Sequence, residues 1–410
     1  MKKKIKIADL FSGAGGLLEG FMQSGLYEPK ASVEWEYAPL ETLRHRLKTK
    51  WNVKDANESA IWFDMQRENE LYEGFEDEKF GRSKGLDHFL ADGVDVIIGG
   101  PPCQAYSQAG RTKDEFGMKY DYRNYLFEHY LNTVERYQPK LFVFENVPGM
   151  LSAMPDGTPI VELIKNDVQR KGYEIIDNIK DHALINISDY GVPQNRKRVI
   201  LVGIRRDERT SEQCQDLLKR FYDEILTKYK SNKKISVYEA IGDLPPLVPL
   251  EKSITIKGIG KQSHTLSELD NSWGHIARFQ NERDINIFGI LAEDLYSGQN
   301  KLQNADSLNE IYNQATGANS KVHKYHVLRP NEPSTTITAH LHKDGLRFIH
   351  YDPKQKRTIT VREAARLQSF PDDFEFLSTR GNQYKMIGNA VPPEFARRLS
   401  LAIAEFLEEL

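Results

Sequence analysis

Short apolar runs that alternate with stretches of helical spacing dominate the first half of the chain, and the runs tend to end at glycine, proline or acidic residues. The apolar runs lie at residues 5–10, 31–33, 94–98, 141–144 and 199–204, and helical spacing falls between them, for example at 124–137 and 158–171. Strands that alternate with helices predict an α/β fold with a doubly wound, mostly parallel sheet. Because ligands bind at the carboxyl ends of the strands in such sheets, we expect the functional residues where the runs end.

The alternating pattern weakens after about residue 245, where the chain becomes polar with scattered aromatic residues. Apolar helical spacing returns at 361–368 and 394–408. A chain of 410 residues is long enough for two or three domains. We therefore predict a discontinuous large domain at 1–245 and 357–410 and a smaller domain at 246–356.

Composition excludes several classes of protein. No apolar run approaches the ~18 residues of a membrane helix, and the two cysteines, Cys103 and Cys214, suit a reducing, cytoplasmic compartment. No Cys/His cluster has the spacing of a zinc site, so no metal is expected. The net charge of −3 does not exclude nucleic acid, since acid is concentrated at 68–79 while 111–123, 194–206 and 321–366 are rich in basic residues and histidine.

A glycine-rich turn follows the first apolar run. Gly13 and Gly15 would let the backbone approach a cofactor closely, and the helix that follows offers free N–H groups. Glu34 ends the next strand, where an acidic residue commonly binds ribose hydroxyls, and Trp35 beside it is suited to stack on an adenine. An ordinary tight turn and a surface glutamate would explain these residues as well.

A second group of chemically active residues follows the later strands. Cys103 comes directly after Pro101-Pro102, which stiffen the approach to it, and a thiolate at a strand end can act as a nucleophile. The polar stretch 104–123 is typical of an active-site loop. Glu145 ends another strand and would face the same crevice. Judged alone, a lone cysteine is more often an inert buried residue.

Two arginines precede the strand at 199–204. Arg196 and Arg198 alternate along an extended segment, so their side chains are expected to point the same way, toward a phosphate or a base edge. Surface salt bridges are the alternative for both arginines.

Taken together, these pieces resemble the DNA (cytosine-5) methyltransferase family, of the bacterial restriction–modification type. The motifs are Asp9-Leu10-Phe11-Ser12-Gly13-Ala14-Gly15-Gly16-Leu17, Gly100-Pro101-Pro102-Cys103-Gln104, Glu145-Asn146-Val147, Gln194-Asn195-Arg196-Lys197-Arg198, Arg362-Glu363-Ala364-Ala365-Arg366-Leu367-Gln368-Ser369-Phe370-Pro371-Asp372 and Gly388-Asn389-Ala390-Val391-Pro392-Pro393. They occur in the order and spacing of that family. The resemblance is weakest at about 54–92 and 246–335.

The resemblance implies a sheet of the S-adenosylmethionine-dependent methyltransferase type, with S-adenosylmethionine as cofactor and a smaller target-recognition domain. The residues it implies at the cofactor are Phe11, Gly13, Gly15, Glu34, Trp35, Asp64, Pro101, Leu126 and Asn389. Asp55 is a rival to Asp64 for the adenine amino group. The implied catalytic residues are Cys103, Glu145, Arg196 and Arg198.

The resemblance also implies the chemistry and the partners. Cys103 would add to carbon 6 of a cytosine flipped out of double-stranded DNA, Glu145 would contact N3, and Arg198 the carbonyl oxygen, with Arg196 in support. The implied DNA contacts are Ser107, Arg111, Arg123, Arg329 and Lys343. A monomer is expected, with a companion restriction endonuclease as a possible partner in the same system.

The sequence disfavours four other functions. An RNA cytosine-5 methyltransferase on the same scaffold would carry a Cys-Phe-Thr tripeptide in the target region, and no cysteine follows Cys214. A catalytically inactive DNA-binding regulator is disfavoured by the intact Cys103 and Glu145. A nicotinamide dehydrogenase would have glycine in place of Leu18, and an amino methyltransferase would have an Asp/Asn-Pro-Pro-aromatic loop where Gly100 precedes the prolines here.

Overall fold

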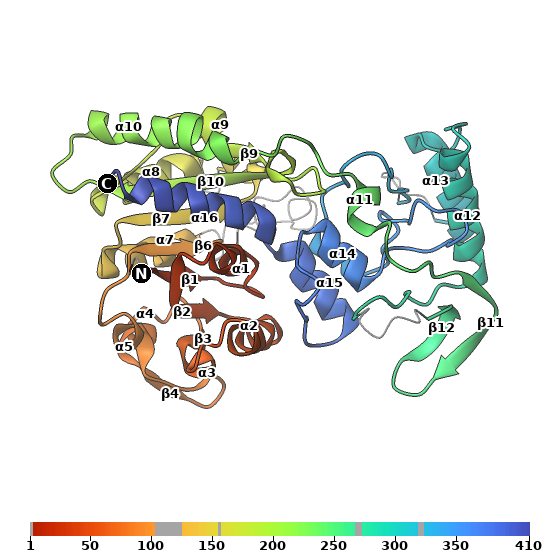
Figure 1. Ribbon diagram of the computed structural model, residues 1–410, viewed down its shortest axis with the longest axis horizontal. Helices are drawn as coiled ribbons and strands as arrows, with labels where there is room; N and C mark the ends of the chain where they lie inside the picture. Colours follow the sequence, from red (N-terminus) through yellow and green to blue (C-terminus); the bar gives the residue numbers. More distant parts are fainter. Residues whose placement is uncertain (1–2, 103–124, 155–156, 267–272, 319–323) are drawn as a thin grey trace. The chain divides into compact units, whose positions relative to one another are not determined.

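A computed structural model describes residues 3–102, 125–154, 157–266, 273–318 and 324–410 (Figure 1). The predicted site residues Cys103, Ser107, Arg111 and Arg123 lie outside these ranges. The chain forms two compact units. The first unit comprises Met1–Tyr190, Lys197–Asn232 and Ala390–Leu410, and the second comprises Gly191–Arg196 and Lys233–Asn389.

The first unit is built on one mixed sheet. Its strands are β1 (Ile5–Leu10), β2 (Tyr27–Glu34), β3 (Ala60–Trp62), β6 (Val96–Gly99), β7 (Leu141–Asn146), β8 (Tyr173–Ile175), β9 (Leu184–Asn186) and β10 (Lys197–Arg205). They lie in the order β3-β2-β1-β6-β7-β10-β8, with β9 paired to β10. The neighbours from β3 to β7 are parallel, and β10 runs antiparallel to β7, β8 and β9. The predicted α/β fold with a mostly parallel sheet is confirmed.

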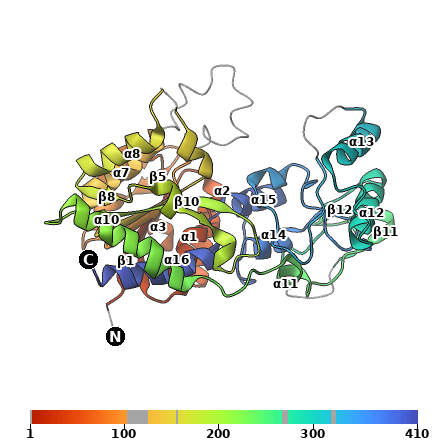
Figure 2. The same ribbon diagram turned by 90° about the horizontal axis from the view of Figure 1, so that it is seen from above.

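Helices cover both faces of this sheet. The α-helices described in the first unit are α1 (Gly16–Gln23), α2 (Tyr37–Thr49), α3 (Ala56–Ser59), α4 (Glu68–Glu73), α5 (Gly85–Phe89), α7 (Leu126–Tyr137), α8 (Ile160–Arg170), α9 (Ile179–His182), α10 (Ser211–Arg220) and α16 (Pro393–Leu407). Short 3₁₀ helices are η3 (Pro148–Ser152), η4 (Ile187–Tyr190) and η6 (Leu226–Tyr229), and η5 (Phe221–Ile225) is a π-helix. Figure 2 shows α7 and α8 on one face and α10 and α16 on the other. Such two-sided cover explains why β1, β6 and β7 read as nearly continuous apolar runs.

The last helix returns to the beginning of the chain. α16 packs along α1, and the hydroxyl of Tyr27 in β2 donates to the carbonyl of Ser400 at 2.7 Å. The apolar spacing at 394–408 therefore belongs to the same unit as the first strand.

Parallel pairing aligns the carboxyl ends of the strands. Leu10 pairs with Val33 on one side and with Gly99 on the other, and Gly99 pairs with Phe144. The residues that directly follow β1, β2, β6 and β7 consequently emerge at one edge of the sheet.

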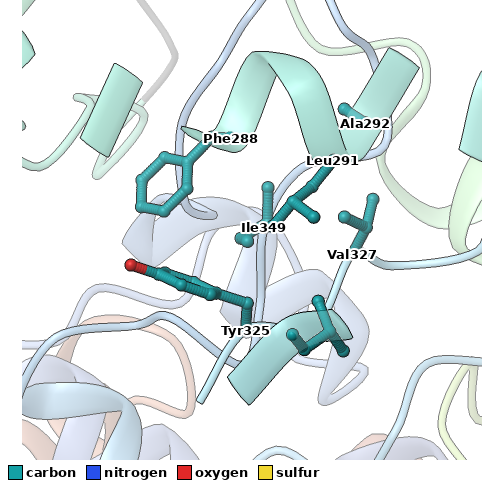
Figure 3. Packing of buried hydrophobic residues seen from close by; sticks show 7 residues of the cluster. Phe288, Leu291, Ala292, Tyr325, Val327 and Ile349 are labelled. Carbon is teal, nitrogen blue, oxygen red and sulfur yellow. The ribbon is translucent and has the colours of Figure 1, made fainter. Parts of the chain in front are cut away.

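The second unit combines helices with a two-stranded hairpin. Its elements are α11 (Val237–Ile241), β11 (Pro249–Ile256), β12 (Gly260–His264), α12 (Glu282–Tyr296), α13 (Ala305–Thr316), η7 (Ala339–His342), α14 (Val361–Leu367) and α15 (Arg380–Asn389). One apolar core of this unit forms where α12 and α13 pack against the following chain (Figure 3). Its buried members are Phe288, Leu291, Ala292, Leu308, Tyr325, Val327 and Ile349. Compared with the predicted domain boundaries, this unit extends further at both ends and also takes in 191–196.

Candidate active site

The turn after β1 has the backbone that the glycine pattern requires. Phe11, Gly13 and Gly15 have φ angles of 57°, 56° and 84°, and Ser12 fixes the turn by donating from its hydroxyl to the carbonyls of Asp9 and Val33 at 3.0 Å. A side-chain carbon built on Gly13 would meet no atom within 4 Å. The left-handed backbone therefore favours glycine, and open space lies over it.

Glu34, the last residue of β2, points its carboxylate at this turn. Its Oε2 accepts the N–H of Gly13 and its Oε1 accepts the N–H of Glu36, both at 2.7 Å. Burial raises the pKa of Glu34 to about 7, although the two N–H donors act in the opposite direction. Each carboxylate oxygen can accept a second hydrogen bond, so the group can still bind a ligand hydroxyl.

Asp9 lies in β1 below the turn and is 1% exposed. Burial, and then the negative charge of Glu34, raise the pKa of Asp9 well above its ordinary value. The carboxylate of Glu34 therefore disfavours ionisation of Asp9 at this end of β1 and β2.

Trp35 and Asp64 lie at the same edge of the sheet as Glu34. Trp35 is 47% exposed, and its carbonyl accepts the indole N–H of Trp62 at 2.8 Å. Glu34 pairs with Trp62, and the N–H of Phe63 donates to the carbonyl of Glu34, so Asp64 follows β3 directly beside the end of β2. Its rival Asp55 precedes α3 and lies ahead of the amino end of β3. The fold thus groups Asp64, and not Asp55, with Glu34 and Trp35.

Glu145 and Arg198 form a pair where β6, β7 and β10 meet. Arg198 Nε lies 2.8 Å from Glu145 Oε1, and each side chain is 13% exposed. Burial lowers the pKa of Arg198, and the charge of Glu145 opposes that shift. A side-chain carbon on Gly100 would lie 2.9 Å from Glu145 Oε2, so glycine lets the loop after β6 pass close to this carboxylate.

Pro101 and Leu126 border the segment that contains Cys103. Asn146 donates its amide N–H to the carbonyl of Pro101 at 3.3 Å, which ties this loop to the end of β7. Leu126 is buried at the first turn of α7. The described residues on either side of 103–124 are therefore anchored in the sheet unit.

Arg196 bonds to groups of the second unit, whereas Arg198 pairs with Glu145. β10 begins at Lys197, so Arg196 lies outside the strand, and it is 1% exposed within the second unit. Its guanidinium donates to the carbonyls of Ile337 at 2.7 Å and Gly388 at 3.2 Å. The two arginines, which alternate along the sequence, therefore bond to different groups in the two units.

Two glutamines that were not predicted as site residues complete this buried network in the second unit. Gln194 and Gln368 are both 0% exposed. Gln194 accepts the N–H of Ile337 at 2.8 Å and donates to the carbonyl of Leu367 at 3.2 Å, and Gln368 donates to the carbonyl of Ile387 at 2.8 Å. The sequence signal for these two glutamines was their position inside apolar or arginine-rich motifs. The network connects segments that are far apart in the sequence.

The other predicted site residues of the second unit are exposed. Asn389 is the last residue of α15, Arg329 lies after the buried Leu328, and Lys343 follows η7. Such positions suit contacts with a ligand or with nucleic acid.

The described ranges contain neither a membrane-spanning helix nor a metal-binding cluster. No helix there is long and apolar enough to cross a membrane. The same residues contain no cluster of three or more His, Cys, Asp or Glu side chains that could hold a metal ion.

Comparisons with known proteins gave consistent matches. Residues 5–405 match the family model for C-5 cytosine-specific DNA methylases. Type II methyltransferase M.Bpa9945I of Bacillus paralicheniformis is 34% identical, and the match covers 98% of this chain and 99% of that protein. Type II methyltransferase M1.HphI of Haemophilus parahaemolyticus is 31% identical over 96% of this chain and 85% of that protein. A prophage-encoded E. coli protein assigned as a DNA modification methyltransferase shares the fold, with a TM-score of 0.59, 23% identity and coverage of 99% and 100%.

Proposed function

The chain belongs to the C-5 cytosine-specific DNA methylase family, and from this premise we propose how its residues divide the work of a type II DNA cytosine-5 methyltransferase. The enzyme methylates carbon 5 of cytosine in double-stranded DNA. The family uses S-adenosylmethionine, which supplies an electrophilic methyl group when bound.

The residues around the turn after β1 suit this cofactor. The open space over Gly13 lets a ligand approach the backbone, and the carboxylate of Glu34 has acceptor sites left for ribose hydroxyls. Trp35 offers an exposed indole for the adenine, and Asp64 an acceptor for its amino group. Phe11, Gly15, Pro101, Leu126 and Asn389 complete the proposed cofactor set.

The proposed chemistry begins at Cys103. Its thiolate adds to carbon 6 of a flipped cytosine, which makes carbon 5 nucleophilic. Glu145 stabilises the adduct by hydrogen bonding or proton donation at N3, and Arg198 contacts the carbonyl oxygen. The new methyl group replaces the proton of carbon 5, and loss of that proton expels the sulfur and restores the ring double bond.

The Glu145–Arg198 pair is the observation that carries this assignment. A carboxylate in contact with an arginine, beside the glycine that precedes Pro101-Pro102-Cys103, is a suitable arrangement for holding the N3 and carbonyl edge of a cytosine. Arg196 acts as a positioning residue, because its guanidinium donates to the backbone carbonyls of Ile337 and Gly388 in the second unit.

The second unit is proposed to read the DNA sequence. Arg329 and Lys343 would contact DNA from this unit, and Ser107, Arg111 and Arg123 would do so from the segment after Cys103. We further propose that the enzyme acts as a monomer in the bacterial cytoplasm. There it would protect host DNA from a companion restriction endonuclease.

Bisulfite sequencing tests the proposed activity. The chain would be expressed in a host that lacks cytosine methylation, and the host DNA would be sequenced after bisulfite treatment. A single short sequence motif with a protected cytosine is expected. Fully converted DNA, together with soluble protein in the same cells, would refute the proposal.

A further inference from the structure

The hairpin of β4 (Phe75–Asp77) and β5 (Gly81–Ser83) lies against Trp35. Lys79, at its turn, places its ammonium 4.2 Å from the centroid of the Trp35 ring, and the ring of Phe80 lies 5.9 Å from the same indole. Trp35 nevertheless remains 47% exposed. The hairpin therefore covers part of this ring and leaves another part open.

Side-chain bonds hold the turn of the hairpin in this position. Asp77 Oδ1 accepts the N–H groups of Lys79 at 2.8 Å and Phe80 at 3.0 Å, and its Oδ2 accepts Arg67 Nη1 at 2.7 Å. The N–H of Arg67 donates to the carbonyl of Asp64 at 3.0 Å. The bond to Arg67, first, and the backbone donors lower the pKa of Asp77 to about 2, so it stays ionised near neutral pH. A continuous set of hydrogen bonds thus runs from Asp64 to Lys79.

Aromatic packing supports the base of the hairpin. Phe63, the residue before Asp64, stacks on Phe75 with ring centroids 3.9 Å apart and meets Phe80 edge-on at 5.1 Å. The guanidinium carbon of Arg67 lies 4.7 Å from the ring centroid of Phe63. The hairpin is consequently joined to the same strand end that carries Asp64.

Lys79 ends an acidic stretch of the sequence and is followed by Arg82 and Lys84. Residues 68–79 contain six acidic side chains, and Lys79 is the only basic one. Such an acidic stretch is unsuited to contact with phosphates. The ammonium instead lies over two aromatic rings, 4.2 Å from the centroid of Trp35 and 4.4 Å from that of Phe80.

We propose that the β4–β5 hairpin braces the surface on which the cofactor adenine stacks, with Lys79 as a positioning residue that acts through Trp35. The ammonium holds the indole in one orientation by a cation–π contact, so the exposed part of the ring is ready for the adenine. This inference rests on the proposed role of Trp35. Exposed cation–π contacts of this kind correspond to about a two- to fivefold effect on affinity.

The affinity of the full chain for S-adenosylhomocysteine, measured by isothermal titration calorimetry, tests the proposed role of Lys79. Lys79→Ala is expected to weaken binding about two- to fivefold, whereas Lys79→Arg, which keeps a cation over the ring, retains it. Lys84→Ala is the matched control, because it removes a lysine at the end of the same hairpin whose ammonium pairs with Glu58 at 3.2 Å. In the Trp35→Ala background, Lys79→Ala should have no further effect.

The outcomes separate the brace from the function on which it rests. Unchanged or tighter binding by Lys79→Ala, with weak binding by Trp35→Ala, overturns the brace and leaves the adenine role of Trp35 intact. The proposal is also overturned if Lys79→Ala lowers the affinity equally in the unaltered protein and in the Trp35→Ala background, because Lys79 would then not act through Trp35. Normal binding by Trp35→Ala refutes the adenine role itself. Thermal melting of each variant identifies a loss of folding.

Discussion

Cofactor affinity should depend on pH through Glu34. Burial raises the pKa of this carboxyl to about 7, so the proton is held more tightly in the folded protein than in an unfolded chain. Ribose hydroxyls donate hydrogen bonds, and the ionised carboxylate accepts them best. The ionised fraction falls about tenfold between about pH 8 and pH 6, and the affinity for S-adenosylhomocysteine should fall by the same factor.

Isothermal titration calorimetry across this pH range would measure the effect, with Glu34→Gln as the control. Glutamine keeps the size of the side chain and does not titrate, so any dependence that persists in this variant belongs to the ligand or to other groups. An affinity of the unaltered protein that is flat between about pH 6 and pH 8 would refute the reasoning, because it would mean that Glu34 has an ordinary pKa of about 4.5.

Two further predictions concern the ion pairs Arg357–Glu363 and Glu145–Arg198. Arg357 and Glu363 in the second unit are each 1% exposed, and their side chains lie 2.7 Å apart. Arg357→Met should lower the free energy of unfolding in urea by about 3–5 kcal/mol, because it leaves the buried charge of Glu363 unpaired, whereas the double variant Arg357→Met with Glu363→Met should lower it far less. Equal losses from the single and the double variant would contradict this prediction. Glu145→Gln should lower kcat by about 10²–10⁴-fold with unchanged affinity for S-adenosylhomocysteine, and a kcat within about threefold of normal would remove Glu145 from the chemistry.

The apolar runs of the sequence predicted the central strands of the sheet in the first unit. The apolar runs at 5–10, 94–98 and 141–144 became β1, β6 and β7, because strands buried on both faces must be apolar throughout. Glu34 was expected at the glycine turn from its place after the second run, and the structure joins it to Gly13.

Other features could not be predicted because they depend on pairing between distant segments. Arg196 and Arg198 look equivalent in sequence, yet one binds carbonyls of Ile337 and Gly388 while the other binds Glu145. The β4–β5 hairpin lies in an acidic stretch without a strong alternating pattern, and its contact with Trp35 joins residues about 45 positions apart. Neither follows from local spacing.

The most direct test of the account is covalent trapping at Cys103. A DNA duplex with 5-fluorocytosine at the mapped target would be incubated with the enzyme and S-adenosylmethionine, and the products analysed by denaturing electrophoresis and mass spectrometry. Fluorine cannot leave as a proton does, so the account predicts a stable protein–DNA adduct that carries one methyl group and is absent from Cys103→Ser. No adduct from an enzyme that methylates normal DNA, or an adduct that persists in Cys103→Ser, would contradict it.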